Sequence, residues 1–116
     1  MKLDFKKTDK YLLVKISGRL DISNTTHFKA EISNYLKDTK LVVFDFSELE
    51  FLDSTGLGSI ISVLKIISKN NGNIFIANLQ EKPRILFEIT RAKRIFDIYP
   101  TLEEAIKAAE NYKEEE

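Results

Sequence analysis

Two adjacent hydroxyl residues, Ser54 and Thr55, are the side chains of this sequence best placed for chemistry. They lie within residues 51–58, which follow a strand-like run and open an amphipathic helix. The first turn of a helix offers unpaired backbone N–H groups and the positive end of the helix dipole, and both favour a phosphate group. The pattern therefore predicts a phosphate-accepting segment. The alternative is a structural role, because Ser and Thr are common N-cap residues, and position alone favours the cap.

The rest of the chain carries no recognisable catalytic set. Asp-Ser-Thr-Gly at residues 53–56 has one residue more than the aspartic protease motif and occurs once, so no proton-sharing pair can form. Phosphate-binding loops, dinucleotide-binding loops and the nucleophile elbow of hydrolases are absent from the sequence. The single histidine, His27, is expected at the surface, and Asp45 is interpreted as structural. We therefore expect a protein that is modified, not an enzyme.

The helix that follows the two hydroxyls has two distinct faces. At 3.6 residues per turn, its apolar stripe consists of Leu57, Ile60, Ile61 and Leu64. The opposite face consists of Ser59, Ser62 and Ile66, with Val63 on its flank. Single exposed apolar residues are common, but these share a helix with the phosphate-accepting segment. We therefore predict that the opposite face binds a partner.

Four further residues are expected to support the site. Gly56 and Gly58 lie in the first helical turn, where each glycine costs up to about 1 kcal/mol of helix stability. Their lack of side chains allows another protein's surface to approach closely. Asp53 is expected to brace the loop in an Asx-type turn. Asp21 is expected in a loop at the end of a strand, where it either approaches Ser54 or serves only as a turn residue, and the turn is favoured.

Hydrophobic patterning predicts an α/β domain. Residues 3–8 and 11–17 alternate as an antiparallel hairpin at a sheet edge. Strands are also predicted at residues 41–46, 74–77 and 95–98, and helical spacing follows each strand from the hairpin onward. A capping box at residues 101–104 begins the last helix, which runs to about residue 112. This order predicts a mixed, mostly parallel sheet of about four to five strands covered by about four helices.

Bulk properties describe a single domain of 116 residues with 43% hydrophobic and 31% charged residues. Its core is expected at about residues 3–112, with a frayed acidic tail at 113–116. A formal net charge of +0 favours neither nucleic acid nor an anionic membrane as partner. The chain has no cysteine, no signal-peptide pattern and no membrane-length apolar run, so a cytoplasmic location without metal or other cofactor is expected.

Residues 41–58 resemble the signature of bacterial anti-sigma factor antagonists, the stand-alone STAS domains. The most specific part is Asp-Ser-Thr-Gly-Leu-Gly at residues 53–58. Residues 18–21 match the family's early Gly-x-Leu/Ile-Asp element, residues 70–72 its turn after the second helix, and residues 101–105 the start of its terminal helix. The resemblance covers about residues 3–112 and implies a STAS-type single domain at residues 1–116.

The resemblance also implies a function. Such proteins are phosphorylated on the serine after the motif aspartate, here Ser54, by the anti-sigma factor itself, an ATP-binding serine kinase. The unphosphorylated antagonist binds the anti-sigma factor and frees the sigma factor. The phosphorylated antagonist is released, and a PP2C-type phosphatase returns it to the unphosphorylated form. Contact or support positions would then be Asp21, Asp53, Thr55, Gly56, Ser59, Ser62 and Ile66.

The sequence departs from the family pattern at one place, and two other functions are alternatives. Many relatives carry Gly-Leu after the third helix, where this chain has Arg91-Ala92 in a basic stretch without a glycine cap. The second function is a STAS interaction module of a signalling scaffold or a lipid-transport complex, in which the hydroxyls only cap and contact. The third is a small enzyme on a flavodoxin-like sheet, against which the lack of a base, of metal ligands and of a cofactor loop argues.

Overall fold

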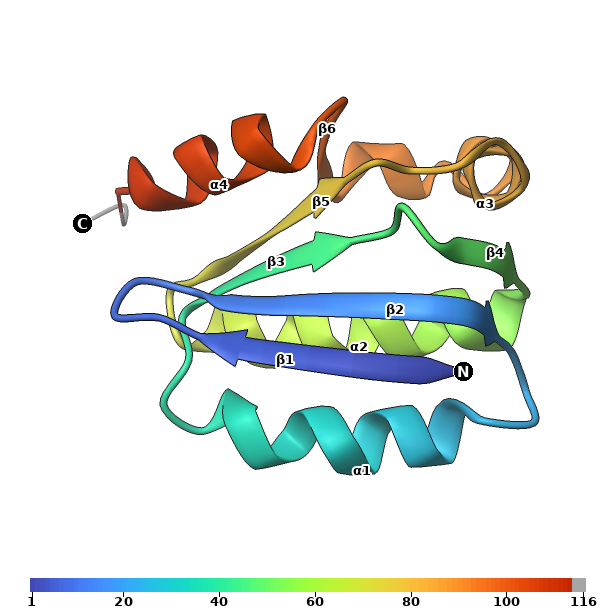
Figure 1. Cartoon of the computed structure of the whole chain (residues 1–116), viewed down its shortest axis with the longest axis horizontal. Helices are drawn as coiled ribbons and strands as arrows, with labels where there is room; N and C mark the ends of the chain where they lie inside the picture. Colours follow the sequence, from blue (N-terminus) through green and yellow to red (C-terminus); the bar gives the residue numbers. More distant parts are fainter. Residues whose placement is uncertain (114–116) are drawn as a thin grey trace.

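The computed structural model describes residues 1–113, which form a mixed β-sheet with helices on both faces (Figure 1). The strands are β1 (Lys2–Lys7), β2 (Leu12–Leu20), β3 (Leu41–Asp45), β4 (Leu49–Leu52), β5 (Asn73–Ala77) and β6 (Asp97–Tyr99). The helices are α1 (Thr25–Leu36), α2 (Ser54–Lys69), α3 (Glu81–Ile89) and α4 (Leu102–Glu110), with a short 3-10 helix, η1 (Ala92–Arg94). Of the predicted frayed tail, residues 114–116 lie outside the described residues.

The sheet confirms the predicted fold class and adds a strand to it. Its order is β1-β2-β3-β5-β6, with β1 antiparallel to β2 and the other pairs parallel. Residues 1–113 contain six strands, and the one that was not predicted is β4. β2 is long enough to pair twice: its residues 12–15 pair with β3, and its residues 18–20 pair with β4. Gly18, with a φ of +90°, lies where the register of β2 against β4 shifts, between Gly18 and Arg19.

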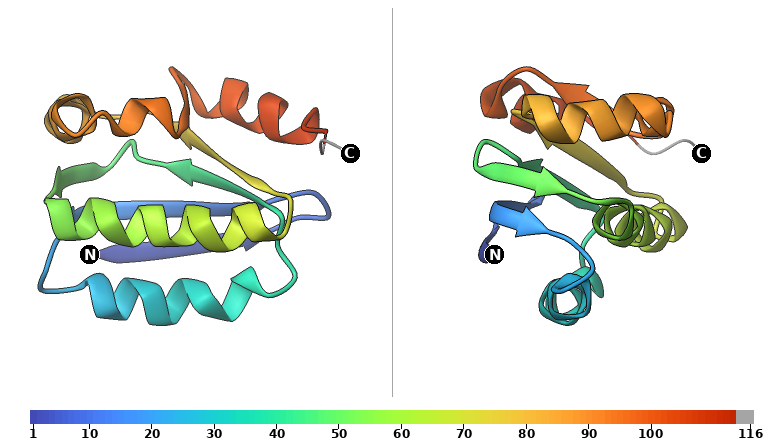
Figure 2. Two further views of the ribbon diagram at one scale, coloured as in Figure 1. Left: turned by 180° about the vertical axis from the view of Figure 1, so that it is seen from behind. Right: turned by 90° about the vertical axis from the view of Figure 1, so that its right-hand side faces the viewer.

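Side chains that alternate along the strands divide between two cores. On one face the sheet packs against α1 and α2, and Phe28, Phe44 and Ile60 are fully buried there. On the other face Val43 and Phe75 pack against residues of α4. Figure 2 shows α4 on the side of the sheet away from α1 and α2. β3 and β5 are therefore buried on both faces, which explains why their sequences are almost continuously apolar.

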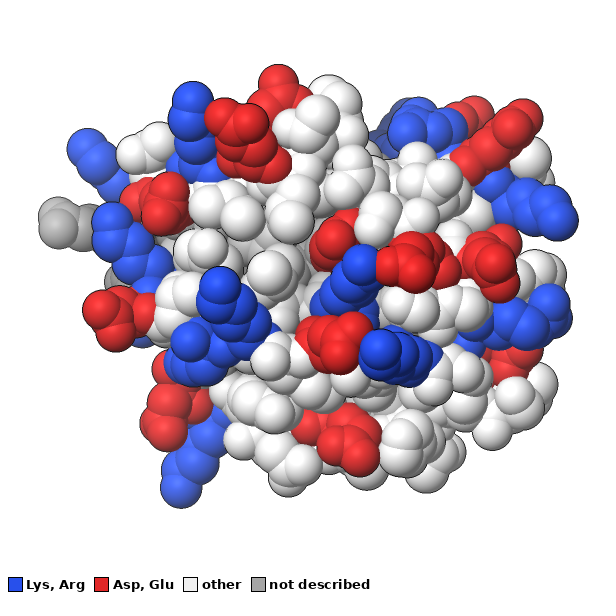
Figure 3. Space-filling model, viewed as in Figure 1, with Lys and Arg blue, Asp and Glu red and all other residues white. Residues whose placement is uncertain are grey.

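Charged side chains cover the half of the sheet that α4 leaves open. β1 and β2 lie in front in the view of Figure 1, and Lys15 of β2 forms an ion pair with Glu48 there. Figure 3 shows acidic and basic side chains interspersed over this view. This mixture agrees with the formal net charge of +0.

One end of the molecule brings together segments that are distant in the sequence. β2 ends at Leu20 and continues through residues 21–24 into α1, while β4 leads directly into α2. α3 packs beside β4. In the right-hand view of Figure 2 these segments face the viewer together. The fold thus places residues 21–24, the start of α2 and α3 at one end of the domain.

Candidate functional site

The first two residues of α2 are Ser54 and Thr55, and both are exposed. Neither is the N-cap, so the structural interpretation of these hydroxyls as caps is wrong. The N-cap is Asp53, whose extended backbone precedes the helix and whose Oδ1 accepts the Gly56 N–H at 2.7 Å. Among the described residues, neither hydroxyl makes a hydrogen bond. Because Asp53 satisfies the helix end, both hydroxyls are available to another molecule.

The second carboxylate oxygen of Asp53 connects the helix start to residues 21–24. Oδ2 accepts the backbone N–H of Ile22 at 3.0 Å, across 31 residues of sequence. Asp53 therefore braces this region as an N-cap and a cross-link between segments, whereas the sequence predicted a local Asx-type turn. The side chain of Ile22 is 74% exposed beside this contact.

Asp21 is the centre of a hydrogen-bonded turn. Its Oδ1 accepts from the N–H and the hydroxyl of Ser23, and its Oδ2 lies 3.3 Å from Arg19 Nε. Asn24 closes the turn, because its Oδ1 accepts the Asp21 N–H at 3.0 Å. The hydroxyl of Ser23, more than the neighbouring Arg19, holds the pKa of Asp21 below its ordinary value. Asp21 is thus a turn residue and an ionised group in the loop tied to the start of α2.

The buried face of α2 is wider than predicted. Ser59 and Val63, which the helical projection placed outward, are 1% and 2% exposed, so the prediction that Ser59 contacts a partner from the surface is wrong. Ser59 is satisfied internally, because its hydroxyl donates to the Gly56 carbonyl at 2.6 Å. α2 packs against both the sheet and α1, and two packing partners bury more than one stripe. Ser62 and Ile66 stay on the outer side, with Ile66 46% exposed.

The two glycines of the first turn have different environments. Gly56 is buried, and a Cβ there would lie 2.2 Å from the Leu20 carbonyl oxygen. The prediction that Gly56 opens space for a partner is therefore wrong, since it allows β2 and α2 to approach each other. Gly58 is exposed, and a Cβ there would have no neighbour within 4 Å. Only Gly58 leaves the surface beside the hydroxyls low.

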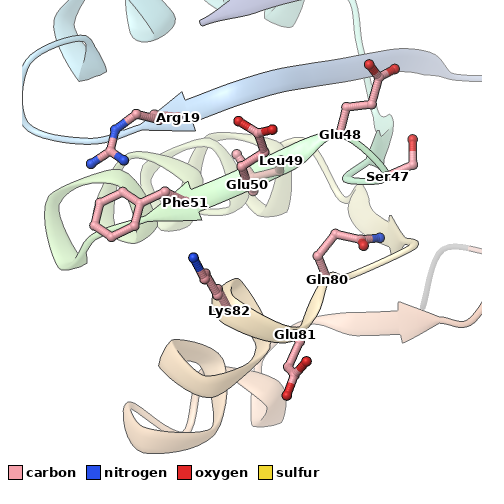
Figure 4. Close-up of a pocket in the computed structure, with 9 residues that line it drawn as sticks. All are labelled: Arg19, Ser47, Glu48, Leu49, Glu50, Phe51, Gln80, Glu81 and Lys82. Carbon is pink, nitrogen blue, oxygen red and sulfur yellow. The ribbon is translucent and has the colours of Figure 1, made fainter.

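A groove lies beside β4, between this strand and the residues that begin α3 (Figure 4). It has a volume of about 520 Å³ and is lined by Arg19, Phe51 and charged residues of both signs. The Arg19 guanidinium lies 4.1 Å from the centre of the Phe51 ring, a cation–π contact. The sequence did not predict this contact. Arg19 belongs to the Gly-Arg-Leu-Asp element, which was recognised. Phe51 lies opposite Arg19 only because β4 pairs with β2, and β4 was not predicted.

The other polar residues that the sequence offers for chemistry lie apart from Ser54 and Thr55 or have structural partners. In the described part of the chain, no group of three or more His, Asp or Glu side chains could hold a metal ion. His27 is exposed on α1, 3.8 Å from Glu31, and Asp45 accepts hydrogen bonds from Ser47 and Asn78 at the end of β3. Within residues 1–113, no helix is long and apolar enough to cross a membrane. The geometry presents an unpaired hydroxyl at a helix start.

Comparison with known proteins gives consistent matches over most of the chain. A family model for the STAS domain matches residues 2–105. The anti-sigma-B factor antagonist of Staphylococcus aureus (strain NCTC 8325 / PS 47) is 28% identical over 101 residues, which are 84% of this chain and 94% of that protein. A Thermotoga maritima crystal structure, provisionally assigned as an anti-sigma factor antagonist, has a TM-score of 0.88 at 28% identity and covers 94% of this chain and 95% of its own.

Two forms of a third protein share the fold. The anti-sigma factor antagonist SpoIIAA in its unphosphorylated form has a TM-score of 0.76 and covers 96% of this chain and 100% of its own. Its phosphorylated form, from Bacillus, has a TM-score of 0.71 and covers 91% of this chain and 97% of its own. Both are 20% identical to this chain, so they establish the architecture alone.

Proposed function

The chain belongs to the STAS-domain family, and from this membership we propose that it is an anti-sigma factor antagonist switched by phosphorylation of Ser54. The unphosphorylated chain binds an anti-sigma factor, which then releases its sigma factor. The anti-sigma factor is also an ATP-dependent serine kinase, and phosphorylation ends the binding. A PP2C-type phosphatase restores the binding form. All these events take place in the cytoplasm. The observation that carries the proposal is the exposed Ser54 hydroxyl, which has no hydrogen-bond partner among the described residues.

The covalent step requires only an accessible acceptor from this chain. Ser54 Oγ attacks the γ-phosphorus of ATP held by the kinase, the bond to the bridging oxygen breaks, and ADP leaves. The hydroxyl proton passes to a base of the kinase. Hydrolysis by the phosphatase returns the hydroxyl and releases inorganic phosphate. Asp53 supports this step, because the N-cap bond to Gly56 holds the first turn of α2 in place.

The proposed contact surface surrounds Ser54 at one end of the domain. Thr55 lies beside it, Asp21 and Asp53 lie in the two connected segments, and Ser62 and Ile66 continue the surface along the outer side of α2. Residues Gly56 and Ser59 support this surface from inside. The low surface at Gly58 allows a partner's backbone to come close to the hydroxyl.

Electrostatics explains how one phosphate would end the binding. A phosphoserine carries a charge of about −1.5 to −2 at neutral pH. In the free protein this charge is tolerated at the start of α2. In the complex the same dianion would lose its hydration, and this loss costs binding free energy. Binding would therefore weaken without unfolding of the domain.

The experiment incubates the full chain with each candidate anti-sigma kinase of the host and ATP, followed by mass spectrometry. We expect a single phosphate on Ser54, none on Ser54→Ala, and an unchanged yield on the matched variant Thr55→Ala. Phosphate on Thr55 alone would move the acceptor but keep the class of switch. Absence of phosphate with every kinase would refute the switch.

A second function keeps the fold and removes the switch. In a signalling scaffold or a lipid-transport complex, the exposed hydroxyls would only contact a partner. Binding distinguishes the two functions. Ser54→Asp should weaken binding to the anti-sigma factor by at least tenfold if Ser54 is a switch, whereas a scaffold would bind some other protein and show no dependence on ATP.

A further inference from the structure

A basic and apolar corner follows β4 around the end of the domain. It consists of α3, η1 and Ile95, residues 81–95. This corner contains three exposed isoleucines: Ile85 at 51%, Ile89 at 75% and Ile95 at 50%. Ile85 and Ile89 are four residues apart on α3, so they lie on one face of the helix. Soluble domains seldom place several large aliphatic side chains together in water without a use for them.

The same corner carries an excess of positive charge on a neutral chain. Residues 81–95 contain five basic and two acidic residues, a net charge of +3, while the whole chain has +0. Lys93 is paired with Glu88 at 3.4 Å. In the described part of the chain, neither Arg91 nor Arg94 has an ion-pair partner. The unpaired charge therefore belongs to the surface and is available for an acidic partner.

The backbone at Arg91 gives an independent observation. Arg91 has a φ of 62° and a ψ of 21°, the left-handed conformation that normally favours glycine. It sits between the end of α3 and the start of η1, where glycine would fit without strain. A long cationic side chain at this position is unfavourable for the fold. The presence of arginine here is therefore better explained by a binding role of its side chain than by the needs of the backbone.

The corner is continuous with the site around Ser54. α3 packs beside β4, and β4 leads into the first residue of α2. In the right-hand view of Figure 2, α3 and the start of α2 lie on the same end of the domain, with β4 between them. A protein that covers Ser54 and the groove beside β4 would thus extend to α3.

We propose that residues 85–95 are a second part of the docking surface, which binds an acidic, partly apolar surface of the anti-sigma factor. This inference rests on the proposed function, and it adds the feature that selects the partner. The isoleucines lose their contact with water on binding, and Arg91 and Arg94 pair with carboxylates. Because these positions are distant from Ser54 along the chain, they contribute affinity that does not depend on the acceptor hydroxyl.

The test measures Kd for the purified anti-sigma kinase by calorimetry, with the full chain and two pairs of variants. Arg91→Gly removes a charge and relieves a left-handed backbone. Asn71→Gly is its matched control, because Asn71 also has a φ of 62° but follows α2 at the helix end remote from Ser54. Ile89→Ser removes apolar surface from α3, and Ser33→Ala is its exposed control, in the half of α1 that is remote from residues 21–24.

We expect Arg91→Gly and Ile89→Ser each to weaken binding by about tenfold. Arg91→Gly should leave the melting temperature unchanged or raise it by a few degrees, and it should also make binding less dependent on salt. Both controls should bind as the parent chain does. Loss of affinity together with equal or higher stability cannot come from misfolding, so this combination supports a direct contact.

Three results would overturn the inference, and they differ from one another. If the kinase binds the parent chain and both variants within twofold, the corner is not part of this interface, while the proposed function stands. If the kinase neither binds nor phosphorylates the parent chain, the proposed function falls first. If Arg91→Gly loses binding only to phosphatidylglycerol vesicles, the corner is a lipid-binding surface.

Discussion

At the scale of single residues, Asp53 organises the backbone around Ser54, the proposed phosphate acceptor. One carboxylate oxygen holds Gly56 N–H and caps α2, and the other holds Ile22 N–H and fixes residues 21–24. The first turn of α2 is thereby held in place, and the Ser54 hydroxyl within it has no hydrogen-bond partner among the described residues. The sequence predicted an aspartate that braces its own loop, but the bond to residue 22 spans 31 positions and has no local signal.

Removal of this carboxylate should affect stability and the loop together. We expect Asp53→Ala to lower the free energy of unfolding by about 1–2 kcal/mol, because a helix cap and a bond between segments are lost. Thr55→Ala is the control, and its effect should stay within about 0.5 kcal/mol. Urea unfolding measures the first effect. Faster amide exchange at Ile22 in Asp53→Ala measures the second, and an unchanged rate there would contradict the role of Asp53 as a cross-link.

At the scale of elements, α2 shows how far periodicity alone can go. The spacing of its apolar residues correctly predicts a helix, and Leu57 and Ile60 are buried as expected. The orientation of the remaining faces was wrong for Ser59 and Val63, since burial depends on what packs against the helix. A projection assumes one packing surface, whereas α2 has two, the sheet and α1. β4 was missed for a related reason: its four residues form a strand only because β2 extends beyond β3.

The two glycines at the start of α2 give a paired prediction. Gly56→Ala should lower the free energy of unfolding by about 2–4 kcal/mol, because its Cβ would lie 2.2 Å from the Leu20 carbonyl oxygen. Gly58→Ala should raise it by up to about 1 kcal/mol, because alanine favours helix and no atom lies within 4 Å of the new Cβ. Thermal or urea unfolding distinguishes the two. Equal effects would mean that β2 and α2 do not approach as closely as described.

Gly58 also allows a test of function at the element scale. If Gly58 keeps the surface low for the anti-sigma factor, Gly58→Ala should bind more weakly although it is more stable.

At the scale of the whole molecule, the proposed switch lies outside the cores that hold the fold together. The core lies between the sheet and the helices on its two faces, and Ser54 lies at the end of the domain, exposed and outside both cores. A charge added there meets solvent in the free protein. Phosphorylation should therefore alter what the domain binds and leave its folded state intact.

Ser54→Asp tests this separation. Its melting temperature should stay within about 2 °C of the parent chain, since surface substitutions away from packed or paired groups change stability little. Amide NMR spectra should differ only around residues 21–24 and the start of α2. Shifts throughout the sheet would indicate a global change of conformation and would count against a switch that acts by direct contact.

The sequence by itself determined the α/β class, the antiparallel hairpin at the edge, the buried strands β3 and β5, the capped terminal helix and the position of Ser54 at a helix start. These features follow from local periodicity and from short-range capping patterns, which the chain carries at every position. Only the tertiary structure decided that Asp53 caps α2 and holds Ile22, that Gly56 and Ser59 face inward, and that Arg91 adopts a left-handed backbone. These features depend on contacts between segments that are distant in the sequence, and packing across the sheet determines those contacts.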